Sequence, residues 1–287
     1  MSGILSVPVG GRLLFQQDLA DVEVWAFAGG RVAVYSARAP HKDRVNEDAM
    51  ALLPVGADRG LLAVADGAGG MRVAHAASRR ALKRLRRAVA EGSHNGWPLR
   101  EAILEGFDRA NAAVSALRGA ATTLAVAEVG TSGVSRCYHA GDTPALVVSG
   151  KGVIKLKTVD HSPVGYAVEA GVIAEEEAIH HRLRHVISNF LGSPDMRIEV
   201  SARVRLVPRD RLLVASDGLF DNLHLEEIVR IVCKGPLLAA ARRLVALCRK
   251  RMETPCPGVP SKPDDLSFLL YGPDPAPRRA GQVERGG

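Results

Sequence analysis

Aromatic residues are scarce in this sequence: Phe, Trp and Tyr together make up only 4% of its 287 residues. Hydrophobic residues still account for 47% of the chain, so its core must rest on Val, Leu, Ile and Ala. Charged residues contribute 24%, which is ordinary for a globular protein, and the length suits one large domain or two small ones. A chain of this size can bury a sizeable core without disulfides or structural metal ions.

Cysteine patterns and long apolar runs are also missing. The four cysteines form no CxxC pair and no regular framework, which argues against a disulfide scaffold or structural zinc and favours a reducing compartment. The N-terminus lacks the basic start and apolar run of a signal peptide, and no uninterrupted apolar stretch is long enough to span a bilayer. We therefore expect a soluble, cytoplasmic protein with no membrane partner.

The net charge of +7 raises nucleic acid or an acidic partner as candidates. Much of the excess lies in residues 79–87, where Arg and Lys alternate with Ala and Leu at helical spacing. The solvated face of an amphipathic helix explains this pattern better than a binding surface does. No aromatic side chain is interleaved with these basic residues, which argues further against binding of single-stranded nucleic acid.

Strand-like and helical segments occur in blocks along the chain. Turn signals at 130–133 and 149–152 predict two β-hairpins, and the long helices come in pairs. This order predicts an α+β fold in which helices cover antiparallel sheets, because a regular strand–helix–strand alternation is missing. The predicted strands are 22–28, 31–37, 61–65, 123–129, 134–139, 145–148, 153–157, 198–206, 211–215 and 266–271, and the predicted helices are 73–91, 99–117, 225–233 and 237–252.

The two ends of the chain show fewer of the hydrophobic patterns that mark strands and helices than its middle does. We expect residues 1–20 to form a loose N-terminal extension and residues 21–272 to form the folded domain. The tail, residues 273–287, is rich in Pro, Gly and Arg, which predicts disorder.

Aspartates stand at glycine turns or strand boundaries in four separated places. Asp66 and Asp217 each follow an apolar run and precede a glycine, Asp142 follows a glycine, and Asp264 opens the last predicted strand. A buried strand holds its terminal side chain rigidly, whereas a single aspartate beside a glycine is usually only a turn. Four together favour a shared metal site, because converging buried carboxylates repel one another unless a cation neutralises them. All-oxygen ligands suit Mg²⁺ or Mn²⁺ rather than zinc.

Eight short motifs surround these positions. They are Asn46-Glu47-Asp48-Ala49, Asp66-Gly67-Ala68-Gly69-Gly70, Ala121-Thr122-Thr123-Leu124, Gly141-Asp142-Thr143, Asp160-His161-Ser162, Asn189-Phe190-Leu191-Gly192, Ser216-Asp217-Gly218-Leu219 and Asp264-Asp265-Leu266-Ser267. In this order they resemble the metal-dependent serine/threonine protein phosphatases of type 2C, in a compact bacterial-like form. The resemblance extends from about residue 34 to residue 270, and eight motifs in order are a specific signal.

The resemblance implies a four-layer sandwich, with two central antiparallel β-sheets flanked by helix pairs. It also implies two Mg²⁺ or Mn²⁺ ions at one edge of the sandwich and a third, weaker ion near Asp142. Asp66 would bridge the two ions, the Gly67 carbonyl would bind one of them, and Asp217 and Asp264 would bind the other.

The implied reaction is hydrolysis of phosphoserine or phosphothreonine in proteins, without a phosphoenzyme intermediate. A water activated by the paired ions would attack phosphorus in line, and the ions would offset charge on the phosphoryl oxygens. Asp48, with Glu47 beside it, would hold coordinated waters and so take part in catalysis. Residues 165–187 would form a flap near the substrate groove.

The phosphate-binding cation departs from the family pattern. The family usually has an Arg three residues before the position of Asn46, but Asp43 stands there. We expect Arg44 to bind the substrate phosphate and assist catalysis, because a guanidinium grips phosphate in a fork and a loop can absorb a shift of one residue. Lys42 is the alternative substrate-binding residue.

Two further positions differ from the family. Ala68 stands where some members carry a His that could protonate the leaving group. Asp265 replaces the usual Asn and adds negative charge beside Asp264, which either strengthens metal binding or simply faces solvent. We expect His161 to be a hydrogen-bonded loop histidine rather than a metal ligand.

Three functions follow as hypotheses. The first is an active phosphatase that acts as a monomer on phosphorylated proteins and opposes a Ser/Thr kinase. The second, suggested by the shifted phosphate-binding residue, is a phosphatase-like binding or scaffold module without turnover. The third is a metal-dependent nuclease, which the basic charge suggests but no nucleic-acid motif supports. Retention of the metal aspartates favours the first.

Overall fold

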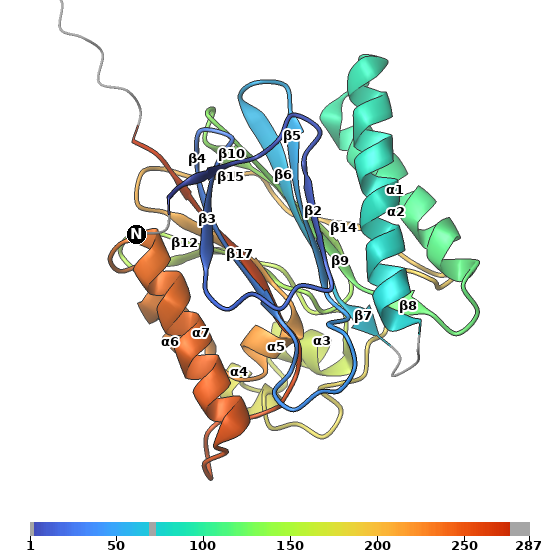
Figure 1. The fold of residues 1–287 in the computed structure, drawn as a ribbon. Helices are drawn as coiled ribbons and strands as arrows, with labels where there is room; N and C mark the ends of the chain where they lie inside the picture. The colour runs from blue at the N-terminus through green and yellow to red at the C-terminus, as the bar shows by residue number, and fades with distance from the viewer. Residues whose placement is uncertain (1–2, 69–72, 276–287) are drawn as a thin grey trace, which may run out of the picture.

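Two β-sheets form the centre of the computed structural model, which describes residues 3–68 and 73–275 (Figure 1). The first sheet comprises, in spatial order, β1 (Leu5–Ser6), β3 (Glu23–Phe27), β4 (Gly30–Ala37), β17 (Leu266–Pro273), β16 (Arg211–Ala215), β12 (Ala145–Val148) and β13 (Ile154–Lys157). The second comprises β14 (Glu199–Val200), β11 (Cys137–Ala140), β9 (Leu124–Gly130), β6 (Arg59–Ala65), β5 (Ala49–Val55) and β2 (Arg12–Phe15). Two short pairs complete the described strands: β7 (Gly67–Ala68) with β8 (Ala121–Thr122), and β10 (Val134–Ser135) with β15 (Val204–Arg205).

Helices cover the outer face of each sheet (Figure 1). The second sheet is covered by α1 (Ala74–His94) and α2 (Leu99–Ser115), and the first by α6 (Leu225–Val232) and α7 (Leu237–Glu253). Three short helices lie toward one end of the sandwich: α3 (Pro163–Glu169), α4 (Glu175–Ala178) and α5 (Asp217–Phe220). The order of layers is therefore helix pair, sheet, sheet, helix pair, as predicted.

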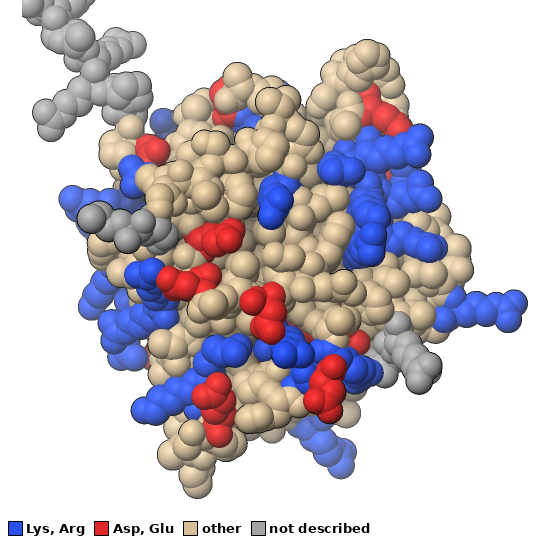
Figure 2. All heavy atoms as spheres, in the orientation of Figure 1, with Lys and Arg blue, Asp and Glu red and all other residues tan. Residues whose placement is uncertain are grey.

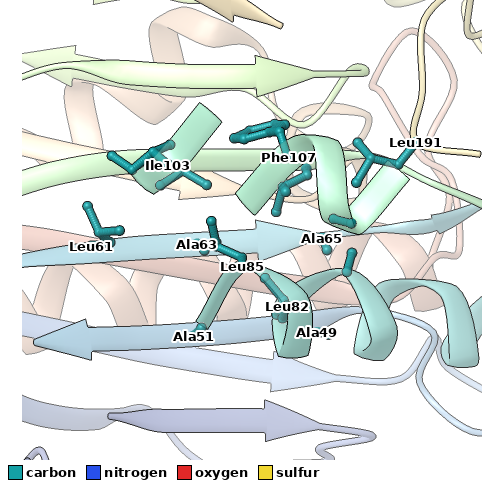
Figure 3. Close-up of a cluster of buried hydrophobic side chains, with 14 of the residues drawn as sticks. Ala49, Ala51, Leu61, Ala63, Ala65, Leu82, Leu85, Ile103, Phe107 and Leu191 are labelled. Atoms are coloured by element: carbon teal, nitrogen blue, oxygen red, sulfur yellow. The ribbon is translucent and has the colours of Figure 1, made fainter. Parts of the chain in front are cut away.

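The central strands are apolar on both faces because each face meets another layer. In β6, Leu61 and Ala63 belong to the core cluster packed against α1 and α2 (Figure 3). Leu62 and Val64 belong instead to the cluster between the two sheets. Side chains alternate between faces along a strand, so a strand buried on both sides is a continuous hydrophobic run. Burial of each large aliphatic side chain stabilises the fold by about 1.5–3 kcal/mol. This packing makes rigid strands, and rigid strands fix the residues at their ends.

The basic stretch on α1 lies in solvent, as predicted. Its apolar stripe, which includes Leu82, Leu85 and Val89, is buried against the second sheet and α2. Arg and Lys side chains project from the outer face of the helix, on the right of Figure 2. Arg79 and Lys83 also cover the ring of Phe15. Packing of the apolar stripe and solvation of the basic face thus explain the alternation of basic and apolar residues on α1, without a binding surface.

Several details of the fold differ from the prediction; for example, the single strand predicted over 198–206 is two short strands, β14 and β15, in different sheets. The segment 1–20 was expected to be a loose extension, but β2 pairs with β5 at the edge of the second sheet, and Leu14 is buried. The strand β5 was missed because its run of apolar residues shows no alternation and contains Pro54. The pairing of β1 with β3 is parallel, so the first sheet is antiparallel except at that edge.

The C-terminal tail and membrane-spanning helices were also subjects of prediction. The predicted disordered tail, residues 273–287, falls mostly outside the described residues, and Pro273 itself closes β17. Among helices in the described part of the chain, none is both long and apolar enough to cross a membrane.

Candidate metal centre

The aspartates of the motifs lie at one end of the sandwich because of strand register. In the second sheet Ala49 pairs with Ala65, so Asp48, just before β5, and Asp66, just after β6, lie side by side. Strands that run in opposite directions bring the start of one and the end of the other to the same edge.

The first sheet brings its own carboxylates to the same end. Ala215 of β16 pairs with Phe268 of β17, which places Asp217, beyond the end of β16, near Asp264, before the start of β17. Strand β12 also pairs with β16, and the turn that leads into it carries Asp142.

The electrostatics of Asp66 show that these carboxylates converge. Burial raises the pKa of Asp66 well above its usual range, and nearby negative charges raise it further. Those charges belong to Asp48, Asp217, Asp264 and Asp142. A group of carboxylates that repel one another this strongly is stabilised by a cation. The donor set is all oxygen, which fits Mg²⁺ or Mn²⁺.

The backbone of Asp66 is fixed by two threonines of the Ala121-Thr122-Thr123-Leu124 motif. Its N–H donates to Thr123 Oγ1 at 3.0 Å, and its carbonyl accepts from Thr122 Oγ1 at 2.7 Å and from the Thr123 N–H at 2.9 Å. The hydroxyl of Thr123 in turn bonds that of Thr143, next to Asp142. The motif therefore holds two of the carboxylates in place relative to one another.

Glycines beside the aspartates are required by close backbone approach. A Cβ on Gly67 would lie 2.5 Å from the Ala74 carbonyl oxygen and 2.9 Å from that of Glu47. A Cβ on Gly218 would lie 2.0 Å from the carbonyl oxygen of Asp265. All three contacts are shorter than a Cβ atom tolerates, so the turns that expose these carboxylates depend on glycine.

A lysine that the sequence reasoning missed lies among the carboxylates. The ammonium of Lys262 contacts Oδ2 of Asp217 at 2.6 Å and Oδ2 of both Asp221 and Asp264 at 2.8 Å. Burial lowers the pKa of Lys262, but the three carboxylates outweigh burial and raise it overall. Two signals in the sequence could have found this cluster: Lys262 stands two residues before Asp264, and Asp221 stands one helical turn after Asp217.

A second lysine is held in a buried ion cluster. Lys42 Nζ contacts Asp265 Oδ2 at 2.6 Å and Glu47 Oε2 at 2.8 Å. Asp265 is only 3% exposed and also accepts from the backbone N–H groups of Ala39 and Glu47, at 2.8 and 2.7 Å. The extra carboxylate at position 265 therefore does not face solvent: it anchors the loop that carries the first motif.

Arg44 and Asp43 are both exposed on that loop. A hollow of about 330 Å³ lies beside them, and its lining includes Lys42, Arg44 and Asp264. The structure thus places both candidate phosphate-binding cations next to one of the candidate metal ligands. The ammonium of Lys42 is enclosed by two carboxylates.

Asp142 faces a further carboxylate, that of Asp160. Burial raises the pKa of Asp142 well above its usual range, and the charges of Asp217 and Asp160 add to the effect. Burial also raises the pKa of Asp160 to about 6. Oδ1 of Asp160 is buried and has no hydrogen-bond partner among the described residues, which makes it a further oxygen available to a cation.

A histidine cluster lies behind Asp142 and offers another grouping of metal-ligand type. Atoms of His139, His161 and Glu199 lie within 4.8 Å of one another, and the two rings stack with centroids 4.3 Å apart. However, His161 Nδ1 accepts from the Gly141 N–H at 3.1 Å and from the Asn189 amide at 2.8 Å. Its proton therefore sits on Nε2 and points to Glu199, 3.1 Å away, which leaves no lone pair there for a metal. His161 is a hydrogen-bonded loop histidine, as expected.

A cavity of about 970 Å³ opens beside Asp142 and Asp217. Its walls include residues of α3 and α4, which belong to the segment 165–187 expected to form a flap, together with residues of α5 and α6. The cavity is large enough to receive a side chain and its flanking peptide, and it opens directly onto the carboxylates.

Comparison with known proteins gives consistent matches. The family profile of protein phosphatase 2C matches residues 37–250. A putative protein phosphatase 2C-type from Streptococcus pyogenes is 33% identical over 185 residues, which cover 60% of this chain and 72% of that protein. The PPM Ser-Thr phosphatase MsPP from Mycobacterium smegmatis, solved in complex with cacodylate, matches with a TM-score of 0.68 at 30% identity, over 85% of this chain and 98% of that one. The catalytic domain of the serine threonine protein phosphatase PstP, solved with 2 manganese ions, matches with a TM-score of 0.62 at 25% identity, over 85% and 97% of the two chains.

Proposed function

Because the chain belongs to the protein phosphatase 2C family of serine/threonine protein phosphatases, we propose that its carboxylate cluster holds two divalent ions, Mg²⁺ or Mn²⁺, and dephosphorylates phosphoserine and phosphothreonine in proteins. The observation that carries the proposal is the convergence of four other carboxylates on Asp66. Carboxylates packed so closely need cations, and a related phosphatase domain was solved with two manganese ions.

The proposed ligands divide between the two sheets. Asp66 would serve both ions, and the Gly67 carbonyl would bind one of them. Asp217 and Asp264 would bind the other ion, and Asp142 would contribute to a third, weaker site. When bound, the paired ions supply an activated water for attack on phosphorus and offset charge on the phosphoryl oxygens.

The remaining roles fall to residues around the ions. Asp48 holds water molecules of the centre, with its carboxylate oriented by the Ser216 hydroxyl at 2.8 Å. Arg44 binds the substrate phosphate from the rim of the hollow beside Asp264, because a guanidinium matches phosphate in a fork. Lys42 has a structural role, since its ammonium already neutralises Asp265 and Glu47.

We also propose the substrate, the opposing enzyme, the oligomeric state and the compartment. The substrate is a phosphorylated protein, an opposing Ser/Thr kinase supplies it, and the chain acts as a monomer. A reducing compartment such as the cytoplasm suits the four cysteines, all of which are free thiols, with Cys137 and Cys248 buried.

Hydrolysis of several substrates tests the proposal directly. We expect release of phosphate from a phosphothreonine peptide in Mn²⁺, loss of release in excess chelator, and much weaker release from a phosphotyrosine peptide. A protein that binds the phosphothreonine peptide without hydrolysing it in any divalent ion would support the scaffold alternative instead. Cleavage of DNA in the same buffers would support the nuclease alternative.

A further inference from the structure

Lys262 is the only lysine among the described residues whose ammonium contacts the carboxylates proposed as metal ligands. It lies within 2.8 Å of an oxygen of Asp217, of Asp264 and of Asp221. The side chain is 23% exposed, so these contacts are partly shielded from water. Asp217 and Asp264 follow β16 and precede β17, and the lysine therefore ties the ends of two adjacent strands together.

The backbone of Lys262 is held firmly in this position. Its N–H donates to Asn222 Oδ1 at 2.8 Å, and its carbonyl accepts from Asn222 Nδ2 at 2.8 Å. The same amide nitrogen donates to the Gly218 carbonyl at 2.9 Å, and Asn222 is fully buried. Asn222 therefore fastens the lysine to α5, which also carries Asp217, so the ammonium cannot drift far from the carboxylates.

We propose that Lys262 is an intramolecular counter-ion that competes with a divalent ion for Asp217 and Asp264 and so sets the metal concentration at which that half of the centre fills. The inference rests on the proposed function, because it takes those two aspartates as ligands. The metal concentration at which Asp217 and Asp264 bind an ion would then depend on Lys262 as well as on the ligands themselves.

The competition follows from the atoms involved. The ammonium uses Oδ2 of both aspartates, and an ion that binds these oxygens must displace it. A protein whose binding-competent state is only partly populated shows an apparent affinity reduced by that fraction. Among the described residues, the carboxylates that Lys262 contacts are those of Asp217, Asp221 and Asp264, so an ion held by Asp66 and the Gly67 carbonyl would not meet the same competition.

Asp221 gives the displaced ammonium another partner. It lies 2.8 Å from Lys262 Nζ and is not one of the proposed ligands. When an ion takes Asp217 and Asp264, the lysine can keep its pair with Asp221 instead of becoming an unpaired, partly buried charge. Asp221 therefore lowers the free energy needed for displacement and favours metal binding.

Calorimetric titration with Mn²⁺ tests the competition in the full chain. Lys262→Gln is expected to tighten one of the two stronger sites by about tenfold and to leave the other nearly unchanged. The matched control is Lys155→Gln, which removes the same charge from a lysine that contacts Asp210, at 2.7 Å, rather than a proposed ligand. Little change is expected in the control.

Two further readouts do not depend on activity. The metal-free form of Lys262→Gln is expected to melt at a lower temperature than the wild-type protein, and Mn²⁺ should remove the difference because an ion then neutralises the carboxylates. Asp221→Asn should weaken Mn²⁺ binding in the wild-type background but not in the Lys262→Gln background. This double-mutant cycle isolates the role of the pair from any effect of either charge alone.

The outcomes separate this inference from the proposed function. Equal Mn²⁺ affinities in wild type and Lys262→Gln, or equal changes in Lys262→Gln and Lys155→Gln, contradict the competition while leaving the metal centre intact. Failure of both wild type and Lys262→Gln to bind Mn²⁺ contradicts the proposed function and the inference together. Binding by Lys262→Gln alone supports both.

Discussion

The hydroxyl of Ser216 donates a hydrogen bond to Oδ2 of Asp48 at 2.8 Å, although the two residues are 168 positions apart in the chain. Ser216 Oγ also accepts from the backbone N–H of Ser267 at 3.1 Å. These bonds join the start of β5 in the second sheet to the end of β16 and the start of β17 in the first. Ser216 therefore couples the two sheets at the end that carries the carboxylates.

Ser216→Ala removes the donor from a buried carboxylate. Asp48 is 3% exposed, and the loss of a hydrogen bond to a buried charged group is expected to lower the free energy of unfolding by about 1–3 kcal/mol. Urea denaturation in the presence of chelator measures this change. Ser115→Ala is the control, because Ser115 bonds only the Asn111 carbonyl at an exposed helix end. Equal effects of the two substitutions would contradict the coupling.

Arg44→Ala tests the phosphate-binding role. We expect KM for a phosphothreonine peptide to rise by about tenfold or more, with a smaller change in kcat, and Arg44→Lys to recover only part of the loss because it lacks the fork. Arg31→Ala is the matched control, because Arg31 is also exposed but pairs with Asp274. An unchanged kcat/KM in Arg44→Ala would mean that another group binds the phosphate.

Lys42→Met tests the structural role of the second lysine. The substitution leaves Asp265 and Glu47 without their cation, so the free energy of unfolding is expected to fall by about 1.5–3 kcal/mol. Asp265→Asn in the same chain should restore part of the loss, because it removes one of the two unpaired charges. Chemical denaturation of the single and double variants gives the coupling energy. Independent, additive effects would show that the pair does not act as a unit.

The buried histidine His139 predicts a pH dependence of stability. Its Nε2–H donates to the Val159 carbonyl at 2.8 Å, Nδ1 has no partner among the described atoms, and burial lowers its pKa to about 4. The unfolded chain takes up a proton near pH 6.5, whereas the folded protein resists until about pH 4. Stability present above pH 6.5 should therefore be lost as the pH falls toward 4, by up to about 3 kcal/mol.

Urea denaturation between pH 7 and pH 4 provides the measurement for His139. His139→Gln should flatten this part of the profile, and His94→Gln, at the exposed end of α1, should leave the slope as it is in the wild-type protein. A wild-type slope that persists in His139→Gln would assign the pH dependence to other groups.

Much of the fold could be predicted because local patterns matched their surroundings. Turn residues marked the hairpin between β12 and β13, and the stripe of Leu82, Leu85 and Val89 marked α1. Strand β5 could not be recognised locally, since burial on both faces removes the alternation that identifies a strand. The strand β2 was missed for a different reason: its four residues are too short for a pattern, and only pairing with β5 stabilises them.

The sequence pointed to the aspartates of the candidate site, but it did not show which carboxylates its lysines contact. Asp66 and Asp217 stand in recognisable strand–glycine contexts, and the register of the two sheets brings them together. Lys262 and Lys42 occur in loops without periodic pattern, and their partners lie far away in the sequence or across a turn. The pairings of Lys42 with Asp265 and of Lys262 with Asp217 span long stretches of sequence, so tertiary packing decides them.

The most direct test of the account is the Mn²⁺-dependent hydrolysis of a phosphothreonine peptide by wild type and Asp66→Asn. Asp43→Asn, an equal change at an exposed aspartate outside the proposed ligands, is the control. We predict that the wild-type protein and the control release phosphate at similar rates and that Asp66→Asn loses at least about a hundredfold in kcat. Equal rates for Asp66→Asn and the wild-type protein would contradict the proposed metal centre.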